Sequence, residues 1–67
     1  MLRFEVVVFP TKETWDAHMD SGEVDGIGAY SFGSFMASSS DRAEQLARIE
    51  LANNGDDPYM VVACERR

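Results

Sequence analysis

Residues 2–9 alternate between two faces in the manner of a β-strand, and most of them are branched or aromatic. One face is wholly apolar, so we expect it to meet a helix, whereas the other face is mixed. The apolar face consists of Leu2, Phe4, Val6 and Val8, and the mixed face of Arg3, Glu5, Val7 and Phe9. We expect Val7 and Phe9 to be covered by another part of the chain or by a partner.

The stretch 38–54 has the spacing of a single amphipathic helix, with about 100° between successive residues. The apolar side of this helix consists of Ala43, Leu46, Ala47 and Leu51, with Ile49 at its flank. Ser39 or Ser40 can cap the first turn, and Gly55 is a typical stop signal. Such a narrow stripe is unstable alone in water, so the pattern predicts a helix packed across a sheet.

A second, shorter helix is expected after Pro10, which ends the first strand. Thr11 is a suitable N-cap, and the helix is predicted to run through Met19 and to end before Ser21-Gly22. Within this helix Trp15, His18 and Met19 share one face. The glycine-rich residues 23–28 then predict a loop or tight turn.

Two more strands are expected on either side of the long helix. Residues 30–37 alternate, but their phase shifts at Gly33-Ser34, which is typical of a β-bulge. Residues 53–58 form a turn cluster, and residues 59–64 contain a branched pair typical of a strand. Residues 65–67 are charged and are expected to fray at the chain end.

The order of these elements is strand, short helix, strand, long helix, strand. It predicts an α+β fold in which residues 1–67 form one small domain. A three-stranded, mostly antiparallel sheet carries the long helix on one face, with the short helix as an addition. A parallel pair remains open at this point, because the short helix can serve either as a crossover or as part of a loop.

Composition narrows the classes of function. The chain has twelve acidic and six basic residues, which give a net charge of −6. Direct nucleic-acid binding requires clustered Lys and Arg, so the balance argues against it and favours a basic protein partner. Most of the acidic excess lies in residues 1–33. The alternative is that this charge serves only solubility.

No catalytic or cofactor motif stands out, so we expect a protein that is not an enzyme and binds neither cofactor nor metal. Cys64 and His18, the one possible thiol–base pair, lie in separate elements. Cys64 is expected to be a small core residue and His18 to pack at a helix edge. The longest apolar run, residues 6–9, cannot span a bilayer and follows no basic segment, so we expect no membrane contact and a cytoplasmic location.

The most promising candidate site combines carboxylates with large amphipathic rings across the short helix and the loop after it. It consists of Trp15, Asp16, Asp20, Glu23, Asp25 and Tyr30. Rings supply buried area at an interface and carboxylates steer a basic partner toward it. In the alternative interpretation, Trp15 belongs to a minor core and the acidic residues only surround it with charge.

The run Ser39-Ser40-Asp41-Arg42-Ala43, which opens a helix between a strand ending at Ala37 and a last strand, resembles small phage-encoded proteins, anti-CRISPR inhibitors among them. This resemblance implies a non-enzymatic viral inhibitor that binds a nucleic-acid-binding defence complex in the host cytoplasm. The same pattern also resembles antitoxins of the HicB type. The alternative is therefore an antitoxin-like or structural domain acting as a homodimer or larger homo-oligomer, through a face or edge formed by Val7, Phe9 and Phe35.

Overall fold

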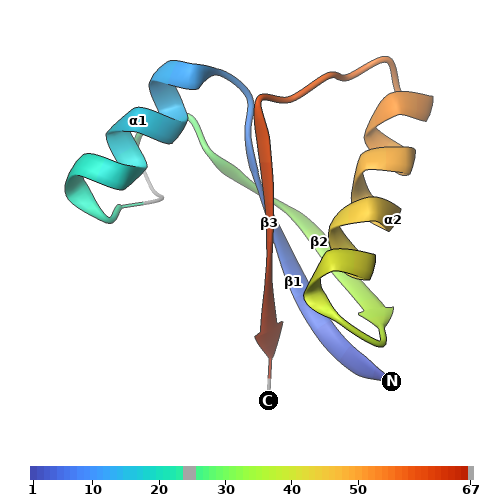
Figure 1. Ribbon diagram of the computed structural model, residues 1–67. Helices are drawn as coiled ribbons and strands as arrows, with labels where there is room; N and C mark the ends of the chain where they lie inside the picture. The colour runs from blue at the N-terminus through green and yellow to red at the C-terminus, as the bar shows by residue number, and fades with distance from the viewer. Residues whose placement is uncertain (24–25, 67) are drawn as a thin grey trace.

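The computed structural model describes residues 1–23 and 26–66 and contains three strands and two helices (Figure 1). The elements are β1 (Leu2–Phe9), α1 (Lys12–Ser21), β2 (Tyr30–Ala37), α2 (Ser40–Asn53) and β3 (Met60–Arg66). The predicted α+β class and the β-α-β-α-β order are confirmed.

The sheet has the strand order β2-β1-β3, and both of its strand pairs are antiparallel. The prediction of a mostly antiparallel sheet is therefore confirmed. Because β2 and β3 both run against β1, they run parallel to each other on its two sides. The connection through α2 consequently crosses over the central strand and places this helix on one face of the sheet (Figure 1).

A β-bulge interrupts the pairing of β1 with β2. Val6 lies opposite Gly33 and Val7 opposite Ser31, so Phe32 is the extra residue. The sequence predicts this bulge at Gly33-Ser34, and the structure places it one residue earlier. Because the phase changes there, Phe32 and Phe35 both pack against the core, and their rings stack with centroids 6.1 Å apart.

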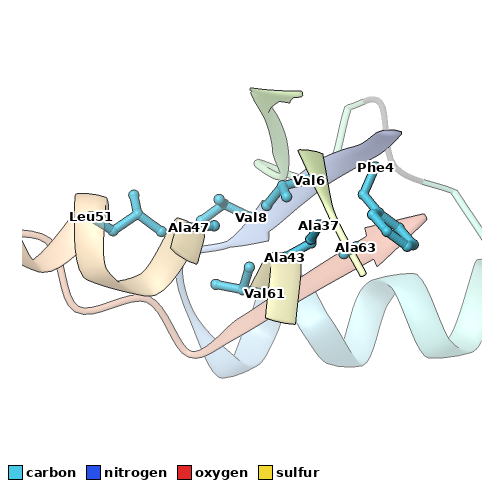
Figure 2. Close-up of a cluster of buried hydrophobic side chains, with 9 residues drawn as sticks. All are labelled: Phe4, Val6, Val8, Ala37, Ala43, Ala47, Leu51, Val61 and Ala63. Carbon is cyan, nitrogen blue, oxygen red and sulfur yellow. The ribbon is translucent and has the colours of Figure 1, made fainter. Parts of the chain in front are cut away.

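The main core lies between α2 and the sheet (Figure 2). It is formed by Phe4, Val6, Val8, Ala37, Ala43, Ala47, Leu51, Val61 and Ala63. Small alanines on α2 allow the helix backbone to lie close to the strands, and Leu51 fills the remaining space. The predicted apolar faces of β1 and α2 are confirmed, except that Leu2 is 45% exposed at the end of the sheet. Leu46 is partly buried, and Ile49 at the flank is exposed.

Local signals set both ends of α2, as the sequence predicts. The Ser39 side chain accepts a hydrogen bond from the Arg42 N–H at 3.3 Å and caps the first turn. At the other end Gly55 has a left-handed φ of 84°, its N–H donates to the Ala52 carbonyl, and the Asp56 N–H donates to the Leu51 carbonyl. This Schellman arrangement stops the helix and turns the chain toward β3.

Helix α1 covers the last residue of β1 from the side opposite α2. Thr11 caps α1 together with Thr14, as predicted for Thr11. The helix ends at Gly22, which has a left-handed conformation, as the Ser21-Gly22 stop signal predicts, although its last residue, Ser21, lies two positions beyond the expected Met19. Phe9 is 1% exposed because Trp15 and His18 pack on its ring, at centroid distances of 5.1 and 4.9 Å. The suggestion that Phe9 contributes to an exposed face is therefore wrong.

Strand β3 extends further than its apolar residues indicate. Glu65 and Arg66 lie opposite Phe4 and Arg3 of β1, and the Arg66 guanidinium contacts a Glu5 carboxylate oxygen at 2.6 Å. The hydrogen bond with Glu5, together with its negative charge, raises the pKa of Arg66. The prediction that the chain frays from residue 65 is thus wrong for these two residues, while Arg67 lies outside the described part.

Candidate functional site

The antiparallel topology brings two acidic segments to the same end of the molecule. Strand β1 ends where α1 begins, and α2 ends where β3 begins, so both connections lie at the end of the sheet opposite the N-terminus and the end of β3 (Figure 1). The Tyr59 N–H donates to the Pro10 carbonyl at 3.2 Å and joins the two connections. We call this region the acidic end; its exposed carboxylates are those of Glu13, Asp16, Asp20, Glu23, Asp56 and Asp57.

The carboxylates on α1 stand on the outer surface of the helix. Asp16 accepts a hydrogen bond from the Lys12 ammonium at 3.1 Å, one helical turn earlier. This hydrogen bond and the negative charge of Asp16 raise the pKa of Lys12, and Tyr59 adds to the shift. Asp20 on α1 and Glu23 just after it are exposed, as Asp16 is.

Trp15, unlike these exposed carboxylates, lies in a partly buried environment. Its ring is half-buried, meets Phe9 edge to face and lies 5.7 Å from the His18 ring. Sequence reasoning left two interpretations open, and the packing agrees with the one in which Trp15 belongs to a minor core. Met19, predicted on the same helix face, is instead 66% exposed, because the contact with Phe9 uses only the first two turns of α1.

Tyr30 lies at the start of β2 and belongs to a second part of the acidic end. Together with Pro10, Asp56, Asp57 and Pro58 it lines a shallow hollow of about 230 Å³. The structure thus places Tyr30 beside Asp56 and Asp57 of the α2–β3 connection. Asp25, the remaining predicted site residue, lies outside the described residues.

Sequence reasoning missed Asp56 and Asp57, which it assigned only to a turn. The signal that could have found them is topological. If β3 pairs antiparallel with β1, the residues just before β3 must lie beside those just after β1, and hence beside α1. The acidic end therefore combines charges that are some forty positions apart in sequence.

The two reactive side chains of the chain are not brought together. Cys64 is exposed on the sheet face opposite α2, where it lies across from Glu5, so the prediction of a core position is wrong. It faces outward because β3 alternates and Ala63 takes the core position. His18 packs at the helix edge as expected, with its Nδ1 2.9 Å from the Glu23 carbonyl oxygen.

Residues 1–23 and 26–66 contain neither a grouping of side chains typical of a metal site nor a helix that could span a membrane. This part of the chain holds no cluster of three or more His, Cys, Asp or Glu side chains with the arrangement of a metal site. Neither α1 nor α2 has the length and the apolar surface that crossing a bilayer requires.

The geometry thus defines a small α+β domain with an acidic end bordered by two half-exposed tyrosines, Tyr30 and Tyr59. Comparisons with protein-family models, with curated proteins and with solved structures found no match to the chain.

Proposed function

We propose that this chain is a non-enzymatic binding protein that docks its acidic end on a basic surface of another protein. The observation that carries the proposal is the convergence of the α1 carboxylates with Asp56 and Asp57 at one end of the sheet. Lys12, the cation of this region, is already paired with Asp16. The local field is therefore negative and attracts a basic partner from a distance.

The same end also offers side chains suited to a protein interface. Tyr30 and Tyr59 are 41% and 44% exposed, and Tyr30 lines the hollow beside Asp56 and Asp57. Tyrosine is enriched at protein interfaces, because its ring buries a large area while its hydroxyl keeps a hydrogen-bond partner. In many protein interfaces charged side chains steer the partner while a buried aromatic side chain supplies most of the contact. The carboxylates around Tyr30 and Tyr59 fit this pattern.

The basic surfaces that most strongly attract such an end are those that hold nucleic acid. We therefore propose that the chain inhibits a host nucleic-acid-binding defence complex by occupying its basic groove, in the manner of the anti-CRISPR proteins that its helix-opening run resembles. In this proposal the acidic end takes the place of phosphates and the chain does not touch nucleic acid itself.

A competition assay tests this function. Purified RNA-guided defence complexes are mixed with fluorescent target DNA, and DNA release is followed by anisotropy as the protein is added. We expect release that weakens as salt rises, because added ions screen the contact. If the DNA stays bound to every complex in the panel at low salt, inhibition of this class of complex is rejected.

A matched pair of variants shows whether the acidic end is the contact. Asp56→Asn with Asp57→Asn removes two charges from this end. Asp41→Asn with Glu44→Gln removes two from the opposite end of α2, and the amide introduced at position 44 keeps an oxygen acceptor for the Ala63 N–H. We expect only the first pair to reduce potency; equal losses would mean that net charge alone matters.

A further inference from the structure

The outer edge of β2 is unusual for a chain of this charge. Strand β2 lies at one side of the sheet, and no described strand pairs with its outer edge. Edge strands expose free N–H and C=O groups, and proteins commonly protect them with charged side chains or proline. Residues 26–40, which include the whole of β2, contain no charged residue and no proline, although the chain carries a net charge of −6.

Two partly buried phenylalanine rings belong to this unprotected edge strand. Phe32 and Phe35 stack on the helix side of β2, and each is only partly buried against the core. Strand β2 is the outermost strand on that side, so these partly buried rings lie next to the unpaired edge. A neighbour at this edge would thus gain backbone hydrogen bonds and apolar burial together.

We propose that β2 pairs antiparallel with β2 of a second copy of this chain. The two three-stranded sheets then join into one six-stranded sheet across a twofold axis near Gly33-Ser34. Both α2 helices lie on the same face, and the Phe32–Phe35 pairs of the two copies meet between them. Such a contact is self-complementary and closes after two copies.

The antiparallel arrangement limits the electrostatic repulsion between two copies. In antiparallel pairing the Tyr30 end of one β2 lies beside the Ala37 end of the other. The two acidic ends therefore point in opposite directions, and like charges stay far apart although each copy carries −6. The other edge is less suitable, because β3 carries Glu65 and Arg66, and Arg66 is engaged with Glu5.

Sedimentation equilibrium of the full chain tests the proposal with two matched variants. Ser34 on β2 and Cys64 on β3 are both exposed and both lie opposite Glu5, so a lysine at either position has a carboxylate nearby in the monomer. Ser34→Lys, however, places two like charges at the twofold axis of the β2 pair. We expect a dimer of the 7.5-kDa chain whose dissociation constant rises at least about tenfold with Ser34→Lys and stays unchanged with Cys64→Lys.

Three results would overturn the proposal: a wild-type monomer at millimolar concentration, an equal effect of both lysines, or an effect of Cys64→Lys alone. Circular dichroism of each variant verifies that the fold is kept. Disulfide trapping gives a second measurement: Ser34→Cys in a Cys64→Ser background should form a linked dimer on oxidation, while wild-type Cys64 should remain unlinked. These readouts involve no DNA, so they remain independent of the proposed inhibition.

Discussion

Phe9 shows how a single side chain can hold a whole helix, α1, against the sheet. It is the last residue of β1 and points to the face opposite the main core, yet it is fully buried. Its alternation within β1 already indicates that it needs cover, and Trp15 and His18 supply this cover from α1. The interaction anchors α1 and thereby positions the carboxylates of Asp16 and Asp20.

We predict that Trp15→Ala lowers the free energy of unfolding by about 1–3 kcal/mol, less than for a fully buried tryptophan because Trp15 is only half-buried. Met19→Ala, on the exposed side of the same helix, should change it by less than about 0.5 kcal/mol. Urea unfolding followed by circular dichroism measures both. An unchanged midpoint for Trp15→Ala would show that its contact with Phe9 is dispensable and would free the ring for a partner.

At the scale of elements, the ends of the helices follow from local chemistry. Ser39, Thr11, Gly22 and Gly55 occupy the positions that their side chains or their left-handed backbones favour, and each of them was recognisable in the sequence. The bulge in β2 differs, because the extra residue is defined only relative to the partner strand. Its displacement from Gly33-Ser34 to Phe32 is decided by pairing with β1.

Capping of α2 can be tested with adjacent serines. Ser39→Ala removes the acceptor for the Arg42 N–H and should cost about 0.5–2 kcal/mol of stability. Ser38→Ala is the control, because Ser38 is exposed and precedes the cap. Thermal unfolding followed at 222 nm compares the two variants; a larger loss for Ser38→Ala would place the start of α2 elsewhere.

At the scale of the whole molecule, charge is distributed unevenly along the sheet. The acidic end holds carboxylates from α1 and from the α2–β3 connection. Near the other end the charges are mixed, with Arg3, Arg42 and Arg66 among Glu5, Asp41, Glu44 and Glu65. Repulsion among the clustered carboxylates opposes folding, because the unfolded chain holds them further apart. The surface proposed for binding is therefore also a source of instability.

Raising the salt concentration should accordingly stabilise the chain. Between about 0.01 M and 0.15 M the screening length falls from about 30 Å to about 8 Å, which weakens repulsion across the acidic end. We predict a higher midpoint of thermal unfolding at the higher salt concentration, and a smaller increase for the Asp56→Asn, Asp57→Asn double variant. A midpoint that falls with added salt would contradict this view of the acidic end.

The helices, the strands and their apolar faces follow from the order of the amino acids alone, because alternation, helical spacing and caps are properties of neighbouring residues. The amino-acid order also places Asp16, Asp20 and Glu23 in one short segment. Contacts between distant segments were needed to bring Asp56 and Asp57 beside Tyr30, to pack Trp15 on Phe9 and to turn Cys64 outward. These outcomes depend on strand order and register, which arise from contacts between segments far apart in the chain.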